Sequence, residues 1–210
     1  MSAGETRSAS DELLVARLRG GDRDVLGELF ALHRERLCRM LHFRMDRRLL
    51  VRIDPDDVLQ EAFLAATTRI DRFTAKPDAS FFVWLRLVVM QTLIDQHRHH
   101  LGADMRDARR DKRLERNASG TATSACLAAQ LAASLTSPSQ NAAGIELMQK
   151  LERAIATMAP VDQEIIALRH FEDLTNTEAA EVLDLSPTAA SNRYVRAIAR
   201  LKEILSPFGE

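Results

Sequence analysis

Apolar residues recur every three or four positions along most of this chain, which is the spacing of one face of an α-helix. The first such stretch predicts a helix capped by Ser10 or Asp11. The sequence Gly20-Gly21-Asp22 predicts a break, after which the pattern resumes at Leu26 and continues to Leu41. The chain therefore opens with two amphipathic helices.

A second pair of helices is predicted over the next fifty residues. Asp54-Pro55 is a cap followed by proline at the first helical position, so it predicts the start of an acidic helix that runs toward Ile70. Residues 71–80 contain Pro77 and read as a loop. Ser80 then caps a strongly apolar helix that extends to His100.

Residues 101–144 differ in composition from what precedes them. A dense run of mixed charge is followed by a stretch rich in small residues. This segment offers little apolar surface to offset the entropy of ordering it, so it is predicted to be a flexible linker with at most a transient helix.

The helical pattern returns from Ile145 and ends in two consecutive helix starts. Thr175 and Glu178 have the spacing of a capping box, and Ser186-Pro187 is a cap followed by proline. Between these starts lie a short helix and a tight turn at Asp184-Leu185. Two short helices joined by a tight turn predict a helix-turn-helix.

These elements place the chain in the all-α class, because no run of alternating β-branched residues bounded by turn signals is present. The predicted architecture is two small helical domains joined by a long linker. The first domain is expected over residues 8–100, the linker over 101–144 and the second domain over 145–207.

The second helix of the predicted helix-turn-helix has two chemically different faces. Ala190, Tyr194, Ala197 and Leu201 share one face at helical spacing, which predicts that this face is buried. The opposite face carries side chains that suit base edges and phosphates in the major groove: Thr188, Ser191, Asn192, Arg193 and Arg196. An ordinary amphipathic helix with a solvated polar face is the alternative, and the two cap signals favour the DNA reader.

Charge argues against a protein that binds DNA unaided. The formal net charge is −1 at pH 7, whereas a free-standing DNA-binding protein usually carries a basic excess. DNA contacts must then come from local basic patches, with help from a partner.

Several other classes of site lack their signatures. Cys38 and Cys126 belong to no metal-binding pattern, and His97, His99 and His100 are spaced so that they do not converge on a helix. There is no glycine-rich phosphate loop and no nucleophile elbow. We therefore expect no metal, no cofactor and no enzymatic activity. No apolar run is long enough to cross a bilayer and the N-terminus lacks a signal-peptide core, so we expect a cytoplasmic protein without membrane insertion.

Four segments, in order, resemble the bacterial RNA polymerase sigma factors of the sigma-70 type, specifically the short extracytoplasmic-function (ECF) group. The segments "LLVARLRGGDRDVLGELFALHRERL" and "DPDDVLQEAFLAA" are similar to the group's opening helices and its polymerase-binding helix. "SFFVWLRLVVMQTLIDQHRHH" resembles the helix that engages the start-proximal (−10) promoter element. The segment from Met158 to Leu205 resembles the region that reads the upstream (−35) element.

The resemblance implies three sets of functional residues. The acidic helix would dock on a coiled-coil of the largest subunit of core RNA polymerase, with Phe63 packing beneath the polar contacts Asp56, Asp57, Gln60 and Glu61. At the start-proximal element the family separates the strands of promoter double-stranded DNA and flips a base of the melted single strand into a pocket. The matching positions here are Phe73, Lys76, Ser80, Trp84, Gln91, Asp95 and Arg98. The upstream element would be read by the polar face of the last helix. The family is often inhibited by an anti-sigma protein that clamps the two domains, so such a partner is also implied.

The sequence departs from the family pattern at several of these positions. Met90 stands where a basic residue is common and Gln91 where asparagine is common, while Asp184 replaces the usual glycine of the turn. Ser191 stands where lysine is frequent, and Ala189 and Ala190 are smaller than usual. These differences predict altered upstream preference or weaker reading. The alternative function is a stand-alone helix-turn-helix repressor or activator, which would bind an operator without polymerase, usually as a dimer.

Overall fold

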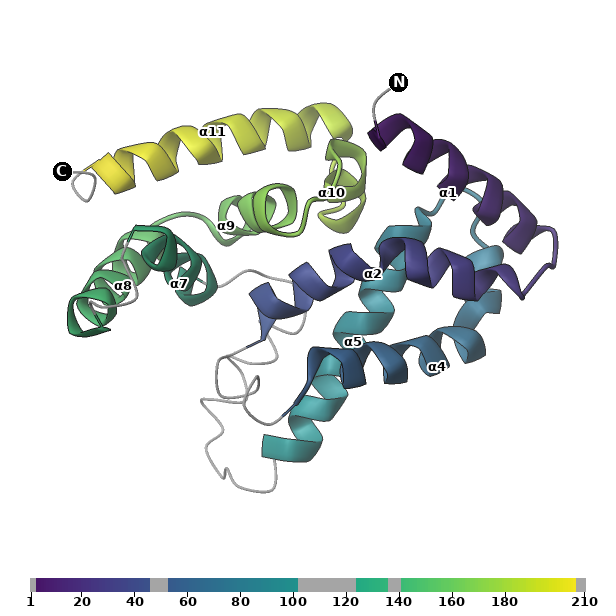
Figure 1. Cartoon of the computed structure of the whole chain (residues 1–210). Helices are drawn as coiled ribbons and strands as arrows, with labels where there is room; N and C mark the ends of the chain where they lie inside the picture. The colour runs from purple at the N-terminus through teal and green to yellow at the C-terminus, as the bar shows by residue number, and fades with distance from the viewer. Residues whose placement is uncertain (1–2, 46–52, 102–123, 136–140, 207–210) are drawn as a thin grey trace.

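The computed structural model describes residues 3–45, 53–101, 124–135 and 141–206, and helices are the only regular elements in these ranges (Figure 1). The all-α prediction is confirmed. Four helices make up an N-terminal unit: α1 (Ala3–Arg19), α2 (Val25–Arg44), α4 (Pro55–Thr74) and α5 (Phe81–Leu101). A C-terminal unit contains the rest: α7 (Ser124–Leu135), α8 (Asn141–Ile155), α9 (Pro160–Ile166), the π-helical turn η1 (Ala167–Phe171), α10 (Asn176–Val182) and α11 (Pro187–Leu205).

The helix starts predicted at Asp54, Thr175 and Ser186 are confirmed. The Asp54 side chain accepts a hydrogen bond from the Asp56 backbone N–H at 2.9 Å, and Pro55 occupies the first turn of α4. Thr175 and Glu178 form a reciprocal capping box at α10, and Ser186 caps α11 by accepting from the Ala189 N–H. Such caps satisfy backbone donors that have no partner inside a helix, so their positions are dictated locally.

Three predicted boundaries differ from the structure. Helix α1 begins at Ala3 and not at Ser10, because the residues before Ser10 include good helix formers. Helix α4 continues to Thr74 because Ile70 and Phe73, three residues apart, are both buried on its core face. Within the helical pattern predicted from Ile145 onward, α9 changes at Ala167 into the π-helical turn η1.

Part of the predicted flexible linker is instead a packed helix. Leu127 and Ala128 of α7 are fully buried, and α7 lies along α8 (Figure 1). The small apolar residues of this segment offer little surface of their own, but they pack on the neighbouring helix α8, which orders them. The remainder of the linker, residues 102–123 and 136–140, lies outside the described residues.

The core of the N-terminal unit is formed where α2, α4 and α5 meet, and α1 covers α2 (Figure 1). Leu29 and Leu37 of α2, Val58 of α4 and Leu85 of α5 are completely buried there. The C-terminal unit has its own core, in which α9 and α11 pack together over α8. The two units are in contact, since Leu168, Leu174 and Ala179 of the C-terminal unit belong to the core of the N-terminal unit.

Candidate functional site

The acidic face of α4 is exposed where the helix begins. Asp56, Asp57, Gln60 and Glu61 are all exposed, and α4 packs its opposite face, with Val58 and Ala62, into the core. Carboxylates in a first helical turn are favoured by the helix dipole. The arrangement is therefore a stable acidic ridge that faces away from the core.

Two of these acidic residues are already engaged within the chain. Asp56 accepts from Arg34 Nη2 at 2.7 Å, and Glu61 accepts a hydrogen bond from Gln96 on α5. No side-chain bond from Asp57 or Gln60 to the described part of the chain is found, and Leu64, one turn on, is 64% exposed. The side chains most available to a partner are therefore Asp57, Gln60 and the apolar Leu64.

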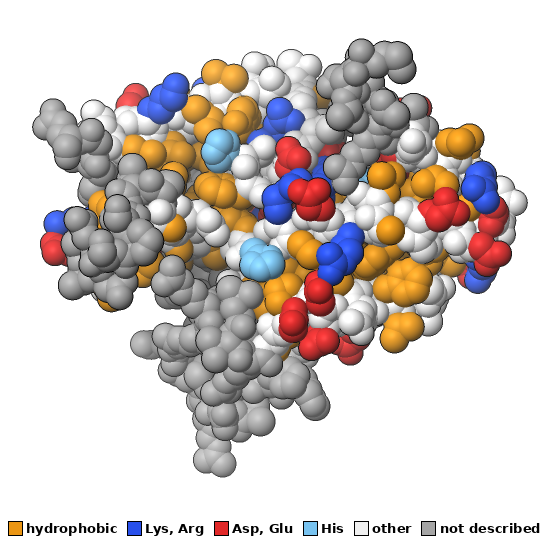
Figure 2. All heavy atoms as spheres, viewed as in Figure 1, with side chains coloured by type: hydrophobic (Ala, Val, Ile, Leu, Met, Phe, Trp, Pro, Cys, Tyr) orange, Lys and Arg blue, Asp and Glu red, His pale blue; other side chains and the backbone are white. Residues whose placement is uncertain are grey.

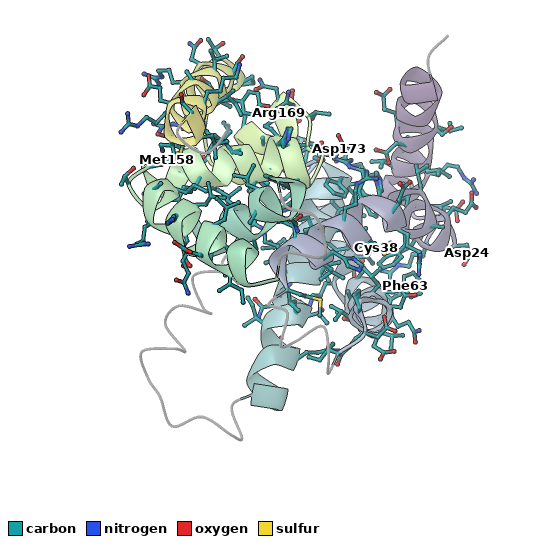
Figure 3. The ribbon with its side chains drawn as sticks, turned by 60° about the vertical axis from the view of Figure 1, so that its left-hand side comes forward. Asp24, Cys38, Phe63, Met158, Arg169 and Asp173 are labelled. Carbon is teal, nitrogen blue, oxygen red and sulfur yellow. The ribbon has the colours of Figure 1, made fainter. Side chains whose placement is uncertain are left out.

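Phe63 lies beside this ridge and is half-buried. Its ring packs edge-to-face on Phe30 of α2, with ring centroids 5.2 Å apart. Cys38 of α2 lies in the same region between α2 and α4 (Figure 3). Burial raises the pKa of the Cys38 thiol. This thiol therefore stays protonated at neutral pH.

The loop between α4 and α5 is braced from outside. Arg19 at the end of α1 donates to the backbone carbonyls of Lys76 and Ala79, at 3.3 and 3.0 Å. The Lys76 side chain is exposed. The Ser80 hydroxyl accepts from the Val83 N–H at 3.4 Å, so Ser80 caps α5 as predicted. These hydrogen bonds fix the backbone of the loop, while the positively charged side chain of Lys76 stays exposed to solvent.

The aromatic residues near this loop form a core cluster. Phe73 is fully buried, with its ring centroid 5.3 Å from those of both Phe81 and Trp84, and the Arg19 guanidinium lies 5.1 Å from it. Phe73, predicted from the sequence as a DNA contact, lies in the core here, because its helix continues far enough to turn the ring inward. Trp84 is half-buried on the same cluster and keeps an accessible edge.

Farther along α5, Gln91 and Asp95 form a surface pair. Gln91 Nε2 donates to Asp95 Oδ1 at 3.2 Å, with Gln91 half-buried and Asp95 exposed. Met90, which replaces a common basic residue, is buried. The side chain of Arg98 lies outside the described residues.

The helix-turn-helix has the geometry that its sequence predicts. Asp184 adopts a left-handed conformation with φ of 53°, and the Leu185 N–H donates to the Ala180 carbonyl at 2.9 Å. Aspartate tolerates this conformation better than most residues, so the turn survives without glycine. Asn176 Nδ2 donates to the Pro187 carbonyl at 2.8 Å and ties α10 to the start of α11.

Helix α11 presents most of the predicted upstream-reading residues to solvent. Ala190 and Ala197 are buried and Tyr194 is half-buried, while the side chains of Thr188, Ser191, Asn192 and Arg196 are exposed. Arg193 differs, because it forms an ion pair with Asp162 of α9 at 2.8 Å. Four of the five predicted residues therefore share an open face, and the fifth is held against α9.

A group of four buried charges between the two units was not predicted from the sequence. Arg44 and Arg86 come from α2 and α5, whereas Glu164 and Glu172 come from α9 and the end of η1. Burial alone would raise the pKa of Glu172, but Arg44 and Arg86 outweigh it and hold that pKa below the ordinary value. Arg86 stands alone in the apolar run "FFVWLRLVVM", and this isolated charge was the signal that a buried partner exists.

The surface shows no broad patch of one sign on the face drawn in Figure 2, where acidic and basic side chains alternate with apolar ones. Within the described residues no cluster of side chains is suited to hold a metal ion. In the same part of the chain, every helix is too short or too polar to cross a membrane.

Comparison with known proteins identifies two matching families. The family described as "Sigma-70 region 2" matches residues 29–101, and "Sigma-70, region 4" matches residues 148–201. The chain is similar to the "RNA polymerase sigma factor CnrH" of Cupriavidus metallidurans, with 28% identity over 96% of this chain and 97% of that protein. It is also similar to the "ECF RNA polymerase sigma-E factor" of Escherichia coli, with 25% identity over 90% of each chain.

Among solved structures, the chain resembles "Structure of CnrH in complex with the cytosolic domain of CnrY". The TM-score is 0.50 and the identity is 25%, and the match covers 94% of this chain and 97% of that one. The likeness therefore extends across both helical units.

Proposed function

This chain belongs to the sigma-70 family of RNA polymerase sigma factors, in its ECF group, and on that basis we propose how it binds its partners. Helix α4 docks on core RNA polymerase, and both helical units contact promoter DNA. The observation that carries this proposal is that one unit has an exposed acidic ridge, while the other has a helix-turn-helix whose second helix exposes a polar face. Sigma factors are regulatory subunits, so the chemistry of RNA synthesis belongs to the polymerase.

The acidic ridge suits a basic protein surface and would be repelled by DNA phosphates. Opposite charges steer the encounter and fix the orientation of the two partners. Asp57 and Gln60 form the polar contacts to polymerase. The exposed Leu64, one turn farther along α4, becomes buried against the same partner surface. Asp56 and Glu61 first exchange their internal partners Arg34 and Gln96, so they contribute less affinity.

The loop ending at Ser80 binds the start-proximal element. Holding a DNA strand open costs roughly a few kcal/mol for each unstacked base. The protein offsets this cost with aromatic stacking surfaces and positive charge. Lys76 provides the charge, and the half-buried Trp84 provides aromatic surface for stacking. Gln91 and Asp95 extend this surface along α5. Arg98 remains a predicted contact of the same surface.

The upstream element is read by α11 in the major groove. Asn192 is suited to a bidentate pair with adenine, and Thr188 and Ser191 meet bases or phosphates. Arg196 contacts phosphate. Arg193 either holds α11 against α9 through its ion pair with Asp162 or leaves that pair to contact DNA.

A regulatory protein is a further proposed partner. The similar CnrH was solved with the cytosolic domain of another protein, CnrY, and the match covers both units of this chain. We expect this chain to be bound by an anti-sigma protein that contacts both of its helical units.

The direct test is co-migration of the full chain with core RNA polymerase on a sizing column, beside the Asp57→Lys variant. Asp71→Lys is the matched control, since Asp71 lies fourteen residues farther along the same helix, about 21 Å away, and is 74% exposed. We expect the wild type and the control to co-migrate and the Asp57 variant to elute alone. If the chain alone binds DNA in a mobility-shift assay and does not bind polymerase, it is instead a stand-alone regulator.

A further inference from the structure

Val195 is an exposed apolar side chain on α11, the helix at the outer edge of the C-terminal unit (Figure 1). The residue is 63% exposed, and among the described residues it is the large apolar side chain of α11 that is open to solvent. A β-branched residue lowers helix propensity, and an exposed one gains little from burial. Val195 therefore contributes little to the fold.

Helical geometry places Val195 at the centre of the polar face of α11. Successive side chains of an α-helix are about 100° apart around its axis. On this spacing Val195 lies about 20° from Thr188 and about 40° from Ser191. It lies about 60° from Asn192 but about 140° from the buried Ala190. A DNA groove that receives the three polar side chains therefore receives Val195 as well.

The polar side chains of this face leave a need for another base contact. Arg193 is paired with Asp162 at 2.8 Å, and the short hydroxyl of Ser191 suits bases and phosphates alike. Asn192 is the residue on this face to which a bidentate base contact is assigned. In the major groove, the thymine C5-methyl group is the apolar feature that base edges display, and apolar side chains contact it. Val195 has the chemistry for this methyl group.

We propose that Val195 reads a thymine methyl group beside the base that Asn192 binds, so that it helps to set the upstream sequence preference. The inference rests on the proposed function, because it requires α11 to lie in the major groove. Three residues advance about 4.5 Å along a helix. Successive base pairs are about 3.4 Å apart. The thymine therefore lies one or two base pairs from the partner of Asn192.

A protein partner suits this surface less well than DNA. Ser191 and Asn192 lie one turn before Val195, and Arg196 follows it directly, so its surroundings are polar. A protein interface needs a contiguous apolar patch. One exposed valine among polar side chains instead matches one methyl group among the polar edges of the bases.

The test begins with selection of an upstream sequence. The full chain is bound to core RNA polymerase, and duplex DNA with a randomised upstream region is recovered from the complex. We expect enrichment of a fixed thymine within two base pairs of a fixed adenine. This thymine is then replaced by uracil, which differs only in lacking the methyl group. Affinities for the thymine and uracil duplexes are measured with wild type and with Val195→Ala.

We expect the wild type to bind the uracil duplex about fourfold more weakly, which is the effect of burying one methyl-sized group. Val195→Ala should bind the thymine duplex at least that much more weakly than the wild type, and should not distinguish thymine from uracil. Ile145→Ala is the matched control, because Ile145 is 57% exposed on α8, and it should discriminate like the wild type. Alanine favours helix formation more than valine, so urea unfolding should show no loss of stability in Val195→Ala.

Three results would overturn the thymine contact. The first is that uracil weakens wild type and Val195→Ala equally, and the second is that it weakens neither. The third is that Val195→Ala reduces binding to core polymerase in the absence of DNA, which would place this side chain against protein.

Asn192→Ala separates these results from a failure of the proposed function. If Asn192→Ala weakens binding to the selected duplex and Val195→Ala does not, α11 reads the upstream element without the thymine contact. If no upstream sequence is enriched with the wild type, the proposed reading by α11 fails and this inference fails with it.

Discussion

Replacing Phe73 distinguishes a core role from a DNA-contact role. Among the predicted site residues whose side chains the structure describes, Phe73 is the buried one. The side chain is completely buried and touches Phe81, Trp84 and the Arg19 guanidinium. Truncating a buried phenylalanine to alanine costs about 3–5 kcal/mol through lost burial and the cavity left behind. Phe73→Leu keeps most of the apolar volume, and we expect it to cost about 1–2 kcal/mol.

The assay is urea unfolding of the full chain followed by circular dichroism, paired with promoter-directed transcription under conditions where each variant is folded. We expect stability to fall in the order wild type, Phe73→Leu, Phe73→Ala. Transcription by the folded Phe73→Leu variant should stay near the wild-type level. Leu13→Ala is the control, since Leu13 is 64% exposed and its truncation should change stability by no more than about 0.5 kcal/mol.

A different outcome would refute this reasoning. If both Phe73 variants unfold like the wild type while promoter use drops, the ring contacts DNA and its burial here is not functionally relevant. The same experiment would then restore the prediction made from the sequence.

Three other perturbations test separate parts of the account. Asn192→Ala should weaken promoter use by about 1–3 kcal/mol for a lost base contact and leave polymerase binding unchanged, as measured by transcription and co-migration. Thr175→Ala removes the cap of α10 and should lower the stability of the C-terminal unit by about 1 kcal/mol in urea unfolding. Acidification should weaken the contact between the two helical units, because Glu172 of the C-terminal unit pairs with Arg44 and Arg86 of the N-terminal unit. These arginines hold the pKa of Glu172 below the ordinary 4.5. The stabilisation is therefore fully present above pH 4.5 and is lost as the pH falls through the lower pKa. Burial raises the pKa of Glu164, although Arg44 acts in the opposite direction, so Glu164 is protonated before Glu172. Its protonation alone should not separate the units. Small-angle X-ray scattering should therefore show an expanded chain only below about pH 4.5.

Local signals predicted the helix starts well because their physics is local. Asp54, Thr175 and Ser186 each cap a helix through a backbone N–H only two or three residues away. The burial of Ala190 and Ala197 followed from helical spacing in the same way. The exposed acidic ridge of α4 was predictable because its apolar residues fix which face is buried.

Features that depend on distant partners were not predicted. Phe73 was assigned to a loop because nothing nearby in sequence reveals Phe81 and Trp84 packing over it. The pairing of Arg44 with Glu172 joins residues 128 positions apart, and each charge looks like an ordinary solvated residue on its own helix. Packing of α7 likewise depends on a neighbouring helix, so composition alone suggested a flexible linker.

The most direct test of the central claim is transcription from genomic fragments by core RNA polymerase with and without this chain. We expect transcripts with discrete 5′ ends only when the chain is added, and their loss with the Asp57→Lys variant but not with Asp71→Lys. If core polymerase gives the same transcripts with and without the chain, the chain does not direct initiation and the account is contradicted.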